Sequence, residues 1–374
     1  MSIMGGYGGY GGYGGYGGYG GYGGYGGYGG YGGYGGPAPE AGPLLAEAMT
    51  KSRGALVGPF QGATVPFTLP VPLDKPDRLA EWSVVPRLQA CELEFLSGLY
   101  FDVNQSRDAM TVGFVDLNKK SLKRVQLARL VRPTASIFRQ QVDLVANYAE
   151  LREDRGSEVL AQTSPSHAPF WGSIVGLQDH RHKWTQELIT LALMLVVDVE
   201  MRFKHAFACP RPMALSPQIQ PMIPTPGHGS WPSGHSTEAF AVVTVLEALI
   251  NSANGTGAKY NEQLQRQAAR IAVNRTVAGV HYPVDSAVGR MLGTALADFF
   301  VARCTGKIKL HERGFNGPRF HGPKDQVLDF DPRVSMIDNK SGYYEYGSTA
   351  SAIAASPLLE FMWTKAAKEW QPLK

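Results

Sequence analysis

The sequence predicts an all-α fold in the form of a helical bundle with short loops. From about residue 81 onward, apolar side chains recur at three- and four-residue spacing, and the alternating pattern of strands is scarce. Compact domains with this pattern pack amphipathic helices around one core. We expect helices over residues 82–99, 122–152 with an interruption at Pro133, 185–206, 233–251, 261–280, 285–304 and 357–370.

Several helix ends are marked by the residue types that favour them. Ser233 is placed as the N-cap of the helix over 233–251, where its side chain can accept from a free backbone N–H. Pro283 ends the helix over 261–280, and Asp285 puts a carboxylate in the first turn of the next helix. The helix over 185–206 is strongly apolar, which predicts a buried position.

Composition divides the chain into three parts. Residues 5–36 are ten GGY repeats closed by two glycines, so we expect residues 1–36 to be a disordered tail. That tail either has no role or self-associates weakly through its spaced tyrosines. Residues 37–80 are rich in Pro and Gly and indicate a linker or a wrapping arm, and residues 81–374 are the helical domain. Within that domain, residues 305–347 are expected to wrap the surface.

Charge and apolar patterning limit the classes of function. The chain of 374 residues has a formal net charge of +4, which is too diffuse to argue for nucleic acid. No apolar segment reaches the roughly 18 to 20 residues of a membrane span, and no basic region followed by an apolar stretch marks a secretion signal. We therefore expect no nucleic-acid partner, no integral membrane segment and a cytoplasmic or otherwise soluble protein, and we leave a homo-oligomer open.

Three short segments carry residues whose combined chemistry is specific. They are KHAFACPRP at 204–212, PSGH at 232–235 and RTVAGVHYPVD at 275–285. Lys204, Arg211 and Arg275 would bring three positive charges near one point, and burying them without an anion is costly. The forked guanidinium groups suit a tetrahedral or trigonal oxyanion. The sequence therefore predicts a buried pocket for phosphate or vanadate.

The PSGH segment adds backbone donors to this pocket. Ser233 and Gly234 stand at a predicted helix start, where backbone N–H groups have no partner within the helix and favour a bound anion. Gly234 also lets the backbone approach that anion closely.

Two histidines have separate expected roles. Asp285 follows His281 by four residues, so its carboxylate can fix the imidazole tautomer and raise the basicity of the other ring nitrogen. That nitrogen can attack phosphorus or coordinate vanadium. His235, at the start of its helix, can act as acid or base on the opposite, apical oxygen. Each residue alone is a weak signal, and the combination carries the prediction.

The three segments fit the motifs KxxxxxxRP, PSGH and RxxxxxHxxxD. Over roughly residues 185–300, the motif core, the chain resembles the superfamily of type 2 phosphatidic acid phosphatases, bacterial non-specific acid phosphatases and vanadium-dependent haloperoxidases. The resemblance implies a catalytic domain with the helical bundle of the acid phosphatase and vanadium haloperoxidase type. It implies that His281 is the phosphorylated nucleophile or the vanadium ligand and that His235 is the acid or base. It also implies that the equatorial oxygens are held by Lys204, Arg211, Ser233, Gly234 and Arg275.

The resemblance leaves two chemistries open, of which we favour the haloperoxidase. His228, seven residues before His235, looks like a histidine of vanadium bromoperoxidases and can hydrogen-bond a peroxide oxygen. Vanadate on His281 would then use hydrogen peroxide to oxidise halide. Met201 counts against the haloperoxidase, because several haloperoxidases have a tryptophan at the corresponding position, three residues before the motif lysine. The alternative is a soluble acid phosphatase that needs no cofactor and cleaves a phosphate ester through a phosphohistidine. A third hypothesis is an assembly protein acting through its GGY tail.

Overall fold

The computed structural model describes residues 43–52, 73–116, 123–163 and 168–371, so the predictions for the GGY tail lie outside the described residues. The described part divides into two compact units, with the break between Gln89 and Ala90. The first unit holds helix α3 (Pro43–Ser52), the 3-10 helix η5 (Pro76–Glu81) and the start of α4 (Val84–Leu96). A helix therefore lies within the segment over 37–80 that composition marks as a linker or arm.

Helices make up most of the second unit, and the predicted helices of the motif core are confirmed there. Helix α8 spans Lys183–Phe207, α10 spans Gly234–Asn254, α11 spans Asn261–Val277 and α12 spans Pro283–Thr305. The others are α5 (Ala135–Tyr148), α6 (Arg152–Ala161), α7 (Ala168–Val175), α9 (Pro212–Leu215) and α13 (Pro357–Lys368). In the part of the chain that the structure describes, no helix has the length and apolar character needed to cross a bilayer.

The all-α prediction is wrong, because the second unit also contains a five-stranded sheet. Its strands are β1 (Leu99–Val103), β2 (Ala109–Asp116), β3 (Lys123–Val131), β4 (Lys309–Asn316) and β5 (Tyr344–Ala352). They lie in the order β1-β2-β3-β4-β5. The β3–β4 pair is parallel and the other three pairs are antiparallel, so the protein is a mixed α/β fold.

A β-bulge explains why the segment over 122–131 reads as a helix. Ala128 pairs with Val112 and Gln126 pairs with Gly113, which leaves Leu127 as an extra residue in β3. Leu127 and Ala128 are therefore buried side by side, and the alternation expected of a strand is broken. The buried positions then recur at a spacing of three, from Val125 to Ala128, which is typical of a helix.

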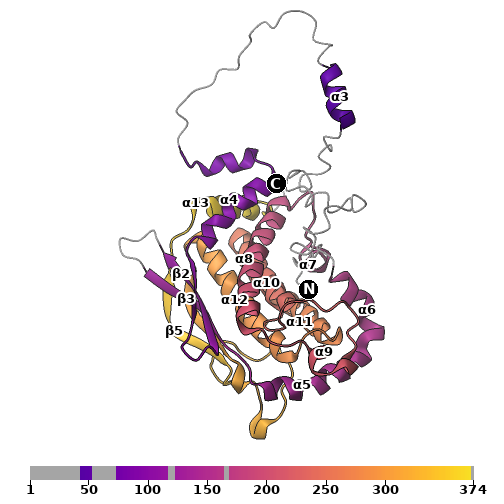
Figure 1. Ribbon diagram of the computed structural model, residues 1–374. Helices are drawn as coiled ribbons and strands as arrows, with labels where there is room; N and C mark the ends of the chain where they lie inside the picture. The colour runs from indigo at the N-terminus through magenta and orange to yellow at the C-terminus, as the bar shows by residue number, and fades with distance from the viewer. Residues whose placement is uncertain (1–42, 53–72, 117–122, 164–167, 372–374) are drawn as a thin grey trace, which may run out of the picture. The chain divides into compact units, whose positions relative to one another are not determined.

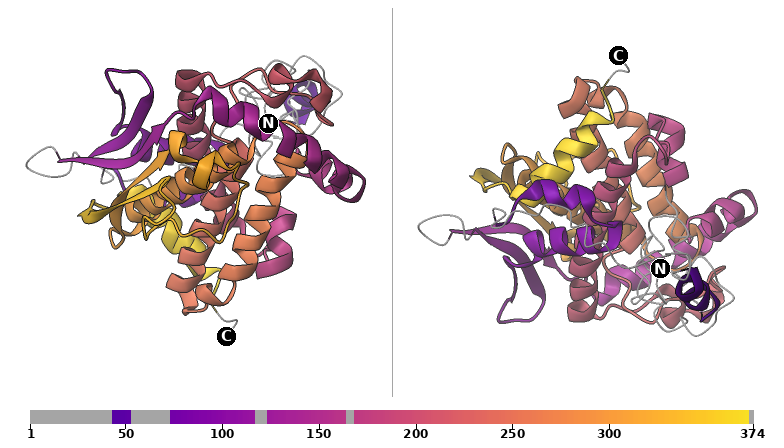
Figure 2. Two further views of the ribbon diagram at one scale, coloured as in Figure 1. Left: turned by 90° about the horizontal axis from the view of Figure 1, so that it is seen from below. Right: turned by 90° about the horizontal axis from the view of Figure 1, so that it is seen from above.

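Helix α12 lies between the sheet and the remaining core helices. It packs against β3 and β4 on one side and against α10 on another, and α10 in turn contacts α8 and α11 (Figure 1). The strands lie to one side of the helices in both views of Figure 2. Phe114 of β2 and Phe299 of α12 pack with ring centroids 4.9 Å apart. The sheet thus buries one flank of α12, and the other flank is left for the helix that carries PSGH.

Glycine allows α10 and α12 to approach closely. A Cβ atom added to Gly293 would lie 2.1 Å from the backbone oxygen of Thr237, and one added to Gly289 would lie 2.9 Å from the oxygen of Ser233. Both distances are too short for any side chain, so the two helices meet backbone to backbone. This contact fixes the start of α10 beside the start of α12.

Candidate active site

The three sequence segments lie at the ends of five helices, α8 to α12. Lys204 lies in the last turn of α8, and Arg211 directly precedes α9. Arg275 lies in the last turn of α11. All the predicted oxyanion and catalytic side chains other than His228 are fully or nearly fully buried: Lys204, Arg211, Ser233, His235, Arg275, His281 and Asp285.

Hydrogen bonds join the start of α10 to the start of α12. The backbone N–H of Ser233 donates to the carbonyl of Asp285 at 3.0 Å, and the hydroxyl of Ser236 donates to the carbonyl of Ser286 at 2.7 Å. Ser233 is the N-cap residue of α10, as expected, but its side chain does not cap the helix. Its Oγ has no hydrogen-bond partner among the described residues. Ser233 therefore keeps a buried hydroxyl available at a helix N-terminus.

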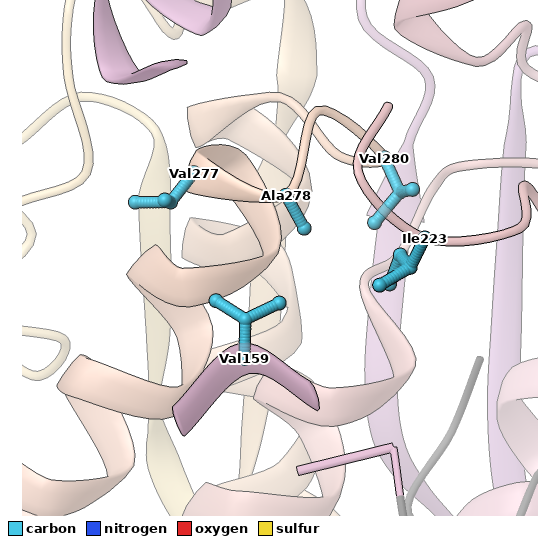
Figure 3. Packing of buried hydrophobic residues seen from close by; sticks show 5 residues of the cluster. All are labelled: Val159, Ile223, Val277, Ala278 and Val280. Atoms are coloured by element: carbon cyan, nitrogen blue, oxygen red, sulfur yellow. The ribbon is translucent and has the colours of Figure 1, made fainter. Parts of the chain in front are cut away.

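A small apolar cluster holds the turn that carries His281. Figure 3 shows the five side chains, which come from α6, from the loop after α9 and from the connection between α11 and α12: Val159, Ile223, Val277, Ala278 and Val280. Arg152 of α6 reinforces the turn by donating to the carbonyl of Val277 at 3.0 Å. Gly279 has a φ of +79°, which favours glycine. This packing fixes the backbone of the turn and thereby the position of His281, which follows Gly279 by two residues.

Arg211 is the centre of the polar network. Its Nη1 donates to the carbonyl of Val280 at 2.8 Å and lies 3.0 Å from Nε2 of His281. Its Nε donates to the carbonyl of His228 at 3.2 Å, and its Nη2 lies 3.2 Å from Nδ1 of the same residue. Both predicted histidines, His281 and His228, are therefore joined to one guanidinium group. His228 is half-buried and lies against Arg211.

The geometry defines the tautomer of His281. Its Nδ1 lies 2.9 Å from Oδ2 of Asp285, which also accepts from the N–H of Tyr282 at 3.1 Å. Nδ1–H is therefore the donor, and the lone pair is on Nε2, where Arg211 donates. Burial first, and then the charges of Arg211 and Lys204, lower the pKa of His281 well below its usual value. The ring is neutral at pH 7, and Nε2 carries its available lone pair.

His235 is held in the opposite tautomer. Its Nε2 lies 3.0 Å from the carbonyl oxygen of Gln162, an acceptor, so this nitrogen carries the hydrogen. Its buried Nδ1 has no partner among the described residues and carries the lone pair. Burial, followed by the charge of Arg275, lowers the pKa of His235 well below its usual value. Proton exchange with a bound molecule would therefore take place at Nδ1.

Buried carboxylates balance the positive charge of Lys204, Arg211 and Arg275. The sequence motifs did not predict this charge balance. Lys204 interacts electrostatically with three acidic groups, and all three are fully buried: Glu200, Glu238 and Asp285. Its ammonium group donates to the carbonyl of Pro232, and burial lowers its pKa to about 8. The argument that three cations by themselves require an anion is therefore incomplete. In the sequence, Glu200 is one position of a predicted apolar helix, and the helical spacing does not single it out.

Gln162, at the end of α6, is a second residue that the sequence did not reveal. Its Oε1 accepts from Nη2 of Arg275 at 2.7 Å and from Nδ2 of Asn274 at 3.2 Å. Asn274 directly precedes Arg275, and its amide joins the same network. Gln162 lies more than 100 residues before these partners and belongs to no motif, so only the tertiary contact identifies it.

Replacing Gln162 by leucine is expected to lower kcat/KM for a phosphate ester about 10- to 100-fold. The substitution leaves a buried guanidinium without one acceptor, and a hydrogen bond to a charged group contributes about 1.5 to 3 kcal/mol. Binding of inorganic phosphate, measured by calorimetry, should weaken in parallel. Gln186→Leu is the matched control, because the Gln186 side chain donates to Asp179 near the start of α8, far from the pocket. Equal kinetics in the two variants would contradict a positioning role for Gln162.

Two other positions near the motifs are separate from this network. His205 follows Lys204 but is exposed, so it faces away from the buried pocket. Met201 is half-buried on α8.

Comparison with known proteins agrees with the motif assignment. A family model described as the PAP2 superfamily matches residues 183–308, which contain all three motifs. One similar solved structure is the crystal structure of a transmembrane PAP2-type phosphatidylglycerolphosphate phosphatase from Bacillus subtilis. It is 17% identical, with a TM-score of 0.35, and the match covers 44% of this chain and 85% of that chain. No match to a curated protein was found. Within residues 183–308, which hold all three motifs, this chain is therefore similar to the PAP2 superfamily.

Proposed function

We propose that the protein is a phosphomonoester hydrolase that works through a phosphohistidine intermediate on His281. The observation that carries this proposal is the pair of hydrogen bonds that define His281: Nδ1–H donates to Asp285 at 2.9 Å, and Nε2 lies 3.0 Å from Arg211. They leave a neutral nucleophile beside a guanidinium that can bind a phosphoryl group. The similarity of residues 183–308 to the PAP2 superfamily supports the same reaction class.

In the first step, Nε2 of His281 attacks phosphorus, and the bond from phosphorus to the ester oxygen breaks. Arg211 moves its hydrogen bond from Nε2 to a phosphoryl oxygen as the N–P bond forms. Asp285 stabilises the positive charge that develops on the imidazole, because its carboxylate accepts from Nδ1. A water molecule then attacks the phosphohistidine and releases inorganic phosphate and free His281.

With the phosphate ester bound beside Arg275, His235 takes up a proton at Nδ1; the leaving oxygen takes this proton in the first step, and Nδ1 accepts a proton from the attacking water in the second. The low pKa of His235 in the free protein is compatible with this role. A phosphate group close to Arg275 offsets the repulsion that this arginine exerts on a protonated ring. Nδ1 is the atom that exchanges the proton, since Nε2 is committed to Gln162.

The negative charge of the transition state is stabilised by donors that are already in place. Arg211 and Arg275 remain charged even though burial lowers the pKa of each to about 10. The hydroxyl of Ser233 and the unpaired N–H groups at the start of α10 add neutral donors. Preorganised donors of this kind avoid reorganisation during the reaction and account for much of enzymatic rate enhancement.

A second candidate, a vanadium-dependent haloperoxidase, is favoured by one observation. His228 lies against Arg211, and burial lowers its pKa to about 3, so it is a neutral hydrogen-bonding group at the edge of the pocket. The donor set that fits phosphate also fits vanadate, with His281 as the ligand and Lys204, Arg211 and Arg275 around the oxygens. Bound vanadate would supply activation of hydrogen peroxide for halide oxidation. His228 would orient the peroxide.

One pair of assays on a single preparation separates the two candidates. Without vanadate, we expect release of the aryl alcohol from a generic aryl phosphate and inhibition of this reaction by added vanadate. With vanadate, hydrogen peroxide and bromide, we expect no bromination of an indicator dye. Bromination without any phosphate release would reverse the preference, and neither activity would overturn both candidates.

A further inference from the structure

Glu200 is a buried acid of the pocket that the mechanism above does not use. It lies on α8, one turn before Lys204, and its side chain is fully buried. Neither of its carboxyl oxygens has a hydrogen-bond partner among the described residues. A buried carboxylate without a donor is costly, so its presence calls for a physical reason.

The carboxyl group lies at the N-terminus of α10, where the oxyanion is expected to bind. A Cβ atom added to Gly234 would lie 2.7 Å from one Oε atom of Glu200 and 3.2 Å from the other. Glu200 therefore occupies the space that a side chain at position 234 would need. Glycine is therefore needed at position 234 for two reasons. It leaves space for the Glu200 carboxyl, and it lets an anion approach the backbone.

The charges that face Glu200 come from two elements. Lys204 on the same helix and Arg211 before α9 both favour its ionised form, while burial disfavours that form more strongly and raises its pKa to about 7. Lys204 is shared with two further buried acids, Asp285 and Glu238. Three cations and three carboxyl groups thus make a pocket with little net charge when all are ionised.

A doubly charged oxyanion entering this balanced pocket would meet an ionised Glu200 at short range. Two negative groups at contact share a proton, because one of the two pKa values rises strongly. Oδ2 of Asp285 already accepts from His281 and Tyr282, and Glu238 has an interaction partner of its own. Glu200 differs from both, because neither of its carboxyl oxygens has a hydrogen-bond partner among the described residues.

We propose that Glu200 is a proton-holding residue of the oxyanion pocket, which becomes protonated when a tetrahedral dianion binds and donates a hydrogen bond to one of its oxygens. This inference rests on the proposed function in so far as both place the oxyanion at the start of α10. It adds that the site takes its ligand together with one proton. Binding of the dianion therefore weakens as the pH rises above the range in which Glu200 titrates.

Infrared difference spectroscopy with sulfate tests the inference directly. Sulfate is a tetrahedral dianion that does not itself titrate near neutral pH, so any new proton is on the protein. At pH 8, sulfate binding to the wild-type chain should produce the C=O stretching band of a protonated carboxyl. Calorimetry in buffers of different ionisation enthalpy should show uptake of about one proton per sulfate.

The band should be absent in Glu200→Gln, which keeps the shape of the side chain. It should remain in Glu187→Gln, which removes another buried carboxyl of the same helix far from the pocket. A band that persists in Glu200→Gln, or no band and no proton uptake in the wild type, would overturn the inference. If Glu200→Gln does not fold, the presence or absence of the band and of proton uptake in the wild-type chain still tests the inference.

Turnover of an aryl phosphate on the same preparation keeps the two proposals separate. Hydrolysis without the carboxyl band would leave the proposed function standing and overturn the role of Glu200. The carboxyl band without hydrolysis would support the role of Glu200 and overturn the proposed function. Failure of sulfate and of inorganic phosphate to bind at any pH would overturn the shared oxyanion pocket.

Discussion

Replacing His281 by alanine is expected to reduce hydrolysis of an aryl phosphate by at least about 10³-fold, because the variant lacks the nucleophile. Nε2 of His281 combines a lone pair, a neutral ring and contact with Arg211, and the other nitrogen of the same ring donates to Asp285. The remaining donors can still bind phosphate, so the loss should fall on kcat rather than on phosphate affinity.

Acid-labile labelling provides a second readout for this variant. The wild-type chain, quenched during turnover of a labelled phosphate ester, should carry label that is lost in acid, as a phosphohistidine is. His281→Ala should carry none. His205→Ala is the control, since His205 is an exposed histidine of α8 that neighbours Lys204 in sequence. Full activity in His281→Ala would require a different nucleophile.

Replacing Asp285 by asparagine is expected to lower kcat by about 10²- to 10⁴-fold while the protein stays folded. In one orientation the new amide N–H₂ faces Nδ1 of His281, which moves the ring hydrogen to Nε2 and removes the nucleophilic lone pair. In the other orientation the amide oxygen keeps the hydrogen bonds from His281 and Tyr282 but lacks the charge that stabilises the imidazolium. Both orientations slow the attack on phosphorus.

Asp298→Asn on the same helix is the matched control for this substitution. Asp298 pairs with Arg313 at 2.6 Å on the side of the sheet, and it contacts none of the pocket residues. Burst kinetics would show the difference, because Asp285→Asn should lose the rapid release of aryl alcohol that precedes steady turnover. Unchanged burst amplitude and rate would mean that Asp285 does not govern His281.

The local residue pattern is enough to predict the pocket but not its full chemistry. The motifs KxxxxxxRP, PSGH and RxxxxxHxxxD name the cations, the helix start and the two histidines. Hydrogen bonds join Arg211, His281 and Asp285, and Arg275 lies against His235. Gln162, which bonds Arg275, and Glu200, which lies beside Gly234, come from outside the motifs. Nothing in their own sequence neighbourhood distinguishes them from ordinary helix residues, because their importance comes from partners far along the chain.

The fold shows a similar division. Helices α8, α10, α11 and α12 follow from apolar spacing and from Ser233 and Pro283 as end signals. The sheet was missed because the bulge at Leu127 hides the alternation of β3, and β4 pairs with β3 from almost 180 residues away. Residues 305–347, expected to wrap the surface, instead contribute β4 and the start of β5.

The sequence by itself determined which side chains can hold an oxyanion and which histidine can attack it, because those abilities belong to the residue types and to their spacing along helices. Only the tertiary structure decided the tautomers of His281 and His235, the charge balance set by Glu200 and the approach of α10 to α12. Those properties depend on distances between atoms that the chain brings together when it packs, and burial then sets which groups carry a proton.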